Sequence, residues 1–147
     1  MLLAALALAL QSAPNLMQPP DQTMMVEPAA MLIATFDANG DGKITRAEMA
    51  AGLARTFAGA DTDHKGSIGY IQYGDWALTW LGDRNALPSP FEVDGDHDNR
   101  ITLAELEAVF DRIFTRLDAN HDGVLTHAEL LTIRAGPFGG DRHRRRH

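Results

Sequence analysis

The chain has 147 residues, of which 45% are hydrophobic, and it carries a formal net charge of −7 at pH 7. This length and apolar content predict one globular domain with a hydrophobic core, which excludes a largely disordered protein. The acidic balance argues against nucleic acid as a partner of the body, and the absence of cysteine excludes disulfides, thiolate nucleophiles and cysteine-based zinc sites.

The N-terminal element is an unbroken Leu/Ala run from Leu2 to Leu10. This length is typical of the apolar centre of a secretory signal, and it is far below the roughly 20 residues that span a bilayer, so no transmembrane segment is expected. No Lys or Arg precedes the run, and Pro14 follows the cleavage candidate Ser12-Ala13, so an apolar N-terminal helix is the alternative. We expect a periplasmic or secreted protein, with a cytoplasmic location as the alternative. Residues 1–13 are interpreted as this signal or apolar segment, and the Gln/Pro-rich residues 14–23 as a linker.

Three stretches of twelve residues, 37–48, 94–105 and 118–129, place oxygen-bearing side chains at the same offsets. Positions 1, 3 and 5 offer side-chain oxygens, position 7 a backbone carbonyl, position 9 a hydroxyl that acts through water, and position 12 a bidentate glutamate. This oxygen set predicts Ca²⁺ as the ligand, because a bidentate glutamate suits seven-coordinate calcium better than octahedral magnesium. The predicted ligands are Asp37, Asn39, Asp41, Lys43 (carbonyl), Thr45 and Glu48; Asp94, Asp96, Asp98, Arg100 (carbonyl), Thr102 and Glu105; Asp118, Asn120, Asp122, Val124 (carbonyl), Thr126 and Glu129.

The loop 94–105 differs from the other two at two positions. Asp96 adds a fourth acid, which strengthens attraction for a cation and also the mutual repulsion of the carboxylates. Asn99 replaces glycine at position 6, where we expect it to adopt the left-handed conformation that asparagine tolerates best among non-glycine residues. We expect this loop to bind calcium.

A fourth stretch, 61–72, keeps part of the same pattern. Lys65 stands at position 5, where it brings an ammonium group to the cation, and Gln72 removes the carboxylate at position 12. Asp61 and Asp63 are therefore predicted to be weak metal ligands at most. The preferred interpretation is a degenerate loop that is retained as a pairing partner for another loop.

The positions of the helices are predicted from the spacing of apolar residues and from the glycine and proline residues that interrupt helices. Apolar residues at a spacing of three and four predict one continuous helix over 102–117, and residues 45–60 match it less strongly. A helix of about 12 residues is expected to end near Gly82, with Trp76 and Trp80 in core or interhelix packing rather than in a ligand cage. Because prolines interrupt the next segment, only a single turn, capped by Ser89 with Pro90 in its first position, is expected before Asp94.

Both pairs of loops begin 24 residues apart, at 37 and 61 and again at 94 and 118, which indicates an internal duplication. We predict a domain over 24–134 with halves 24–72 and 83–134, followed by a disordered basic tail over 135–147. A 16-residue helix such as 102–117 spans about 24 Å and would hold its two loops apart. We therefore predict that loops pair between the halves rather than within one half.

These loops resemble those of the EF-hand superfamily, and more narrowly those of small bacterial-type, calmodulin-like proteins with closely spaced hands and an export signal. The resemblance covers roughly residues 24–134 and implies an all-α fold, an array of four helix-loop-helix units in two duplicated halves. It also implies short β-bridges between paired loops at position 8, where the residues are Ile44, Ile68, Ile101 and Leu125.

The predicted function is non-catalytic calcium binding by a monomer that serves as an exported calcium buffer or is stabilised by the ion. The alternative is a calcium sensor, or an interaction module that calcium locks in shape, with an unknown protein partner. No enzyme is expected, because the sequence has no nucleophile motif and no phosphate-binding loop. His64, His97 and His121, at position 4 of three loops, are interpreted as outward-facing polar residues rather than as a second metal site.

Overall fold

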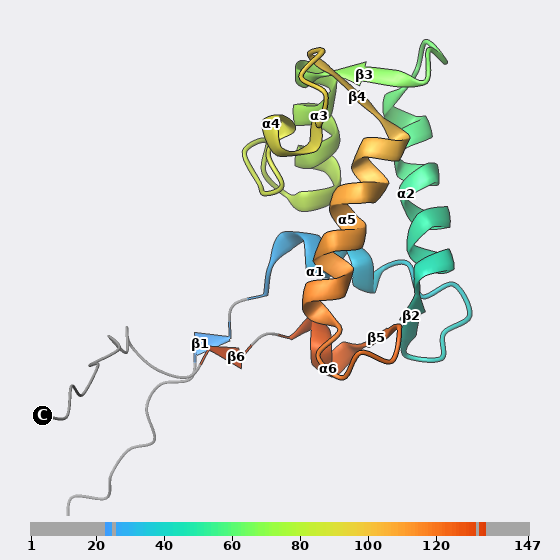
Figure 1. Ribbon diagram of the computed structural model, residues 1–147, viewed down its shortest axis with the longest axis vertical. Coiled ribbons are helices and arrows are strands. Elements are labelled where there is room, and N and C mark those ends of the chain that lie inside the picture. The colour runs from blue at the N-terminus through green and yellow to red at the C-terminus, as the bar shows by residue number, and fades with distance from the viewer. Residues whose placement is uncertain (1–22, 25, 132, 135–147) are drawn as a thin grey trace, which may run out of the picture.

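The computed structural model describes residues 23, 24, 26–131, 133 and 134 (Figure 1). The Leu/Ala run, the predicted linker except for its last residue Thr23, and the basic tail lie outside these residues. The helices are α1 (Pro28–Ala34), α2 (Arg46–Ala60), α3 (Tyr70–Leu81), α4 (Pro90–Val93), α5 (Leu103–Leu117) and α6 (His127–Leu130). The strands are β1 (Thr23–Met24), β2 (Lys43–Thr45), β3 (Ser67–Gly69), β4 (Arg100–Thr102), β5 (Val124–Thr126) and β6 (Ile133–Arg134). None of the helices in the described part is long and apolar enough to cross a membrane.

The two longest helices, α2 and α5, connect one end of the molecule to the other (Figure 1). Each has 15 residues and begins at a threonine N-cap, Thr45 or Thr102. Each ends at the first aspartate of the next loop, Asp61 or Asp118, which is its C-cap. The prediction that one continuous helix leaves one loop and enters the next is therefore confirmed for both helices.

The segment between the halves also follows the sequence prediction. The helix α3 ends at Gly82, whose φ of 82° gives the left-handed C-cap that glycine accommodates without strain. Ser89 precedes the four-residue α4, and its backbone N–H donates to Glu92 Oε2 at 2.7 Å. The single turn expected before Asp94 is thus confirmed.

The two tryptophans of α3 differ in how deeply they are buried. Trp76 is 2% exposed, but Trp80 is 44% exposed. Trp80 lines a hollow between α2 and α3 together with Gly59 and Ala60. Because these facing residues carry almost no side chain, nothing large enough covers the Trp80 indole.

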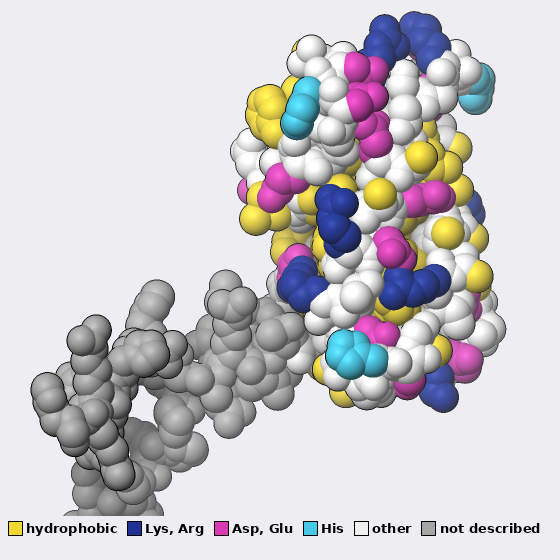
Figure 2. Space-filling model, in the orientation of Figure 1, with side chains coloured by type: hydrophobic (Ala, Val, Ile, Leu, Met, Phe, Trp, Pro, Cys, Tyr) yellow, Lys and Arg dark blue, Asp and Glu magenta, His cyan; other side chains and the backbone are white. Residues whose placement is uncertain are grey.

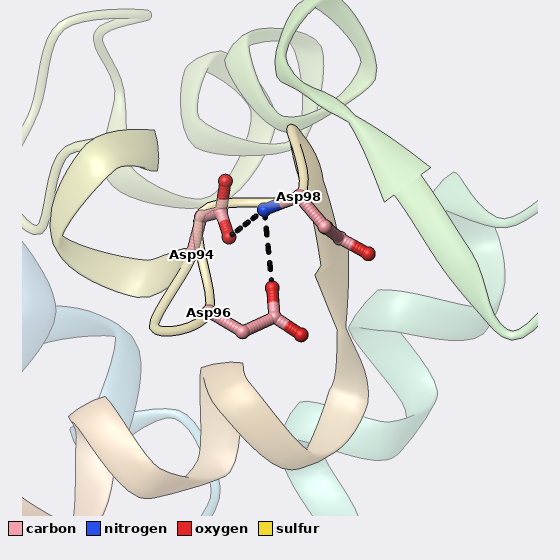
Figure 3. A group of neighbouring side chains, drawn as sticks. All are labelled: Asp94, Asp96 and Asp98. Carbon is pink, nitrogen blue, oxygen red and sulfur yellow. Dashed lines mark hydrogen bonds between the residues drawn. The ribbon is translucent and has the colours of Figure 1, made fainter.

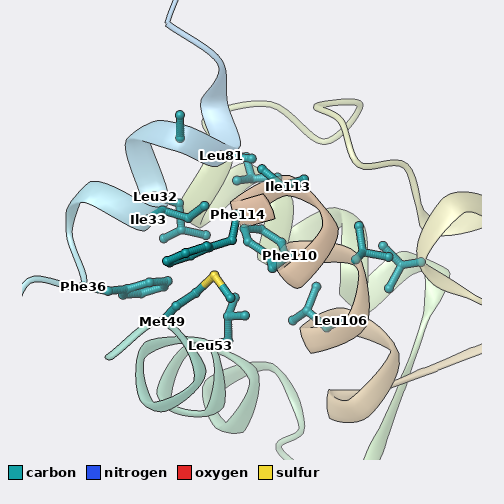
Figure 4. Packing of buried hydrophobic residues seen from close by; sticks show 14 of the residues in the cluster. Leu32, Ile33, Phe36, Met49, Leu53, Leu81, Leu106, Phe110, Ile113 and Phe114 are labelled. Carbon is teal, nitrogen blue, oxygen red and sulfur yellow. The ribbon is translucent and has the colours of Figure 1, made fainter. Parts of the chain in front are cut away.

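One hydrophobic core joins elements from both halves (Figure 4). The α5 side chains Leu106, Phe110 and Phe114 are fully buried and pack with residues of α1 and α2, among them Ile33 and Leu53. The apolar stripe of α5 is therefore buried from Leu106 to Leu117, as the spacing of its residues predicts.

The short strands determine which loops lie together. The strand β2 pairs antiparallel with β5 through Ile44 and Leu125, and β3 pairs with β4 through Ile68 and Ile101. These two sheets lie at opposite ends of α2 and α5 (Figure 1). These two pairings confirm the prediction that loops pair between the halves. Within each half, a 15-residue helix separates the two loops. The third sheet, β1 with β6, joins the two ends of the described chain.

Two glycines of α2 offer a matched test of how Phe36, which follows α1, packs on α2. A Cβ added at Gly52 would overlap the ring of Phe36, whereas one added at Gly59 would meet nothing within 4 Å. We expect Gly52→Ala to lower the free energy of unfolding by about 1–3 kcal/mol through overpacking. Gly59→Ala should raise it by up to about 1 kcal/mol, because alanine has the higher helix propensity. Urea unfolding at one fixed calcium concentration measures both, and stabilisation by Gly52→Ala would contradict the observed contact.

Candidate metal centre

All four loops are closed by the aspartate at position 1. Asp37, Asp61, Asp94 and Asp118 each accept hydrogen bonds from the backbone N–H groups of positions 5 and 6 of their own loop, at 2.7–3.2 Å. The last three of these aspartates are buried. The loop 61–72 therefore shares these position-1 hydrogen bonds with the three loops that are predicted to bind calcium.

The side chains at positions 3 and 5 continue this pattern in the three predicted calcium loops. Position 3 accepts the N–H of position 5, as between Asn39 Oδ1 and Asp41 N at 2.8 Å. Position 5 accepts the N–H of position 7, as between Asp122 Oδ1 and Val124 N at 2.9 Å. The position-7 residues Lys43, Arg100 and Val124, predicted to offer carbonyls, begin β2, β4 and β5. The backbone thus wraps around the side-chain oxygens of each loop.

Residues in the left-handed backbone conformation allow the tight turns of the loops. At position 6, Gly42, Gly66 and Gly123 have φ of 78°, 75° and 81°, and Asn99 has φ of 64°, which confirms the conformation predicted for the asparagine. At position 4, His64, His97 and His121 also adopt positive φ, and their side chains are exposed. Sequence reasoning placed these histidines correctly at the surface, but it missed their backbone conformation.

The residues at positions 9 and 12 start the helix that leaves each loop. Thr45, Thr102 and Thr126 accept the N–H of the glutamate three residues later, and that glutamate accepts the N–H of the threonine. The other carboxylate oxygen, Oε1, accepts the N–H of Gly95 in the case of Glu105, at 3.0 Å. Glu129 Oε1 similarly accepts from Asn120 N, at 3.4 Å. In these two loops the position-12 glutamate therefore ties the end of the loop to its beginning, and in all three loops the threonine acts as an N-cap.

Carboxylates converge most closely in the loop 94–105. Oxygens of Asp94, Asp96 and Asp98 lie within 4.8 Å of one another, and the backbone N–H of Asp98 donates to both Asp94 and Asp96 (Figure 3). The hydrogen bond from Asp98 acts to lower the pKa of Asp96. Partial desolvation and the charges of Asp98 and Glu105 outweigh it, so the pKa of Asp96 lies above its ordinary value. This repulsion among carboxylates is what a bound divalent cation would relieve.

The position-12 glutamates show the opposite shift. Burial acts to raise the pKa of Glu105, but hydrogen bonds from Thr102 and from the N–H of Gly95 bring it below its usual value. The backbone N–H of Thr126 is the main cause that lowers the pKa of Glu129. Both side chains are therefore held as charged acceptors. An all-oxygen donor set of this kind, without nitrogen or sulfur, fits calcium.

A residue from another loop completes this site, and sequence reasoning missed it. The Tyr70 hydroxyl donates to Asp94 Oδ2 at 2.6 Å. This hydrogen bond is the main cause that lowers the pKa of Asp94, and it raises the pKa of Tyr70 to about 12. Tyr70 is position 10 of the loop 61–72, so only knowledge that β3 pairs with β4 could have pointed to the contact.

The loop 61–72 carries a positively charged side chain, Lys65, among its own carboxylates. The Lys65 ammonium lies 3.0 Å from Asp63 Oδ2. Gln72 Oε1 accepts the N–H of Gly69 at 2.9 Å, in the place that glutamate takes in the other loops. Arg100 lines the same hollow of about 230 Å³ as Asp61, Asp63 and Lys65. Figure 2 shows Lys and Arg side chains at the end of the molecule that carries β3 and β4. The positive charges around Asp61 and Asp63 oppose a divalent ion there.

Comparison with known proteins gives one family. The family model described as EF hand matches residues 32–54 and 110–133. The two matched segments contain the loops 37–48 and 118–129, which are joined by β2 and β5, and the loops 61–72 and 94–105 lie outside them. No match was found among curated proteins.

Proposed function

Because two segments of the chain match the EF-hand family model, we propose that it is a member of the EF-hand superfamily that binds Ca²⁺ reversibly, without catalysis, through the loops 37–48, 94–105 and 118–129. The observation that carries this proposal is the convergence of Asp94, Asp96 and Asp98 within 4.8 Å in a loop that repeats the hydrogen bonds of the two matched loops.

Each loop would use its residues in the same roles. The side chains of positions 1, 3 and 5 and the glutamate at position 12 supply the oxygens, while the backbone N–H groups hold these side chains in place. The threonine at position 9 links the loop to its exiting helix, because its hydroxyl and the glutamate cap each other. Bound calcium would neutralise the clustered carboxylates, and it would stabilise the folded state by mass action.

The proposed role of the loop 61–72 is structural. Its backbone is closed by Asp61 as in the other loops, but the Lys65–Asp63 ion pair supplies the positive charge. The loop 94–105 is thus paired through β3 and β4 with a loop that needs no calcium.

We further propose, from the Leu2–Leu10 run, that the protein is exported. Extracellular calcium modules have dissociation constants of roughly 10⁻⁴–10⁻³ M, so such loops would be largely filled where calcium is millimolar. In that setting the ion would serve for buffering or for stability rather than for signalling.

Removal of one position-12 carboxylate at a time tests the calcium proposal. Glu48→Gln, Glu105→Gln and Glu129→Gln should each remove about one of about three binding events per chain, because a bidentate carboxylate is the strongest single ligand of the loop. Glu107→Gln, on α5 outside the loops, is the matched control and should leave the number unchanged. Calorimetric calcium titration counts the sites. A wild-type value of one or none, or an equal loss in the Glu107 variant, would overturn the proposal.

A further inference from the structure

Tyr70 connects the loops 61–72 and 94–105, which begin 33 residues apart in the sequence. It is the first residue of α3 and belongs to the loop 61–72, but its hydroxyl contacts the first aspartate of the loop 94–105. The β3–β4 pairing of Gly69 with Arg100 brings the two loops together at this point. Asp94 is 0% exposed, so its Oδ2 accepts a hydrogen bond from the Tyr70 hydroxyl rather than from bulk water.

The contact fixes one carboxylate oxygen of Asp94. Oδ2 accepts both the Tyr70 hydroxyl at 2.6 Å and the Asn99 N–H at 3.0 Å, whereas Oδ1 accepts only the longer hydrogen bond from Asp98 N at 3.2 Å. The Tyr70 ring is itself held by an edge-to-face contact with Phe91 of α4, at 5.1 Å between centroids. Two donors on Oδ2 orient the carboxylate so that Oδ1 remains the more available oxygen.

This arrangement differs from those of the other three loops. Among the hydrogen bonds of the described residues, Asp37, Asp61 and Asp118 accept from backbone N–H groups only. The loop 94–105 is also the one with four acids, so its carboxylates repel one another most strongly. A neutral hydroxyl donor at Asp94 withdraws some of this negative charge without adding a competing cation.

We propose that Tyr70 is a positioning residue for the calcium site of the loop 94–105, whose hydroxyl holds Asp94 in its ligand orientation. The inference rests on the proposed calcium binding of that loop. The loop 61–72 would then supply a hydrogen-bond donor, Tyr70, to a calcium ligand of the paired loop, Asp94. Hydrogen-bond partners that orient metal ligands typically change metal affinity about 10–100-fold when they are removed.

The position-6 amides allow each loop to be followed separately. The N–H groups of Gly42, Gly66, Asn99 and Gly123 each donate to the position-1 aspartate of their own loop. In a calcium titration followed by ¹H–¹⁵N NMR, each amide signal therefore reports its own site. Tyr70→Phe should move the Asn99 midpoint to about tenfold higher calcium and leave the Gly42 and Gly123 midpoints unchanged.

Tyr73→Phe is the matched control. Its hydroxyl donates to the Pro88 carbonyl at 2.6 Å in the core, so the variant loses a hydrogen bond of the same kind away from the calcium loops. The Asn99 midpoint should stay at its wild-type value in this variant. An unchanged Asn99 midpoint in Tyr70→Phe, or an equal shift of all three amides or in both variants, would overturn the role of Tyr70. A wild-type chain whose Asn99 amide does not respond to calcium would instead overturn the proposed function of the loop.

Discussion

Lys65→Asp combined with Gln72→Glu will convert the loop 61–72 into a calcium site and raise the stoichiometry from about three to about four ions per chain. The backbone of this loop already carries the hydrogen bonds from Lys65 N and Gly66 N to Asp61. The two substitutions remove the ammonium that pairs with Asp63 and supply the missing carboxylates at positions 5 and 12.

Lys65→Ala is the control for this conversion. It removes the internal cation but leaves glutamine at position 12, so the stoichiometry should stay at about three. Calorimetric titration of the wild type and both variants gives the three numbers. If the double variant also binds about three ions, the side chains at positions 5 and 12 are not what disables the loop.

Phe114→Ala should lower the free energy of unfolding by about 3–5 kcal/mol, because it removes a fully buried aromatic ring and leaves a cavity. The ring lies in the core shared by α1, α2 and α5 (Figure 4). The Arg46 guanidinium covers it at 4.4 Å from the ring centroid. Arg46 also hydrogen-bonds Asp111 and Thr115 of α5, so the substitution disturbs the place where the loop 37–48 meets this helix.

Phe91→Ala serves as the comparison for the same chemical change at the surface. Phe91 is 69% exposed and contacts the Tyr70 ring edge-to-face, so its loss should cost less than about 1.5 kcal/mol. Urea unfolding at one fixed calcium concentration compares both variants with the wild type under the same conditions. Similar losses for the two phenylalanines would contradict the assignment of Phe114 to the core.

Much of the fold could be predicted because the same residues carry local structure and the loop pattern. The threonine and glutamate at positions 9 and 12 are at once predicted ligands and a helix-capping pair, so the loop motif also marks where α2 and α5 begin. The pairing of loops between the halves followed from helix length, since a helix of 15 residues is about 22 Å long. These features depend on neighbours in the sequence, which is why periodicity and spacing reveal them.

Contacts between distant residues could not be predicted in this way. The Tyr70–Asp94 hydrogen bond requires the register of β3 against β4, and the exposure of Trp80 depends on the small residues that face it. The positive φ of His64, His97 and His121 is a local feature of the loops, and glycine at the same position of the loop 37–48, Gly40 with φ of 72°, was the signal for it. In the first two cases tertiary context decided the outcome.

The central claim is that three of four similarly folded loops bind calcium and that the loop 61–72 does not. A calcium titration of the wild-type chain, followed at the amide signals of Gly42, Gly66, Asn99 and Gly123, tests it directly, because each of these N–H groups donates to the position-1 aspartate of its own loop. The signals of Gly42, Asn99 and Gly123 should move to saturation while that of Gly66 remains in place. A Gly66 signal that saturates together with the other three, or an Asn99 signal that does not move, would contradict the claim.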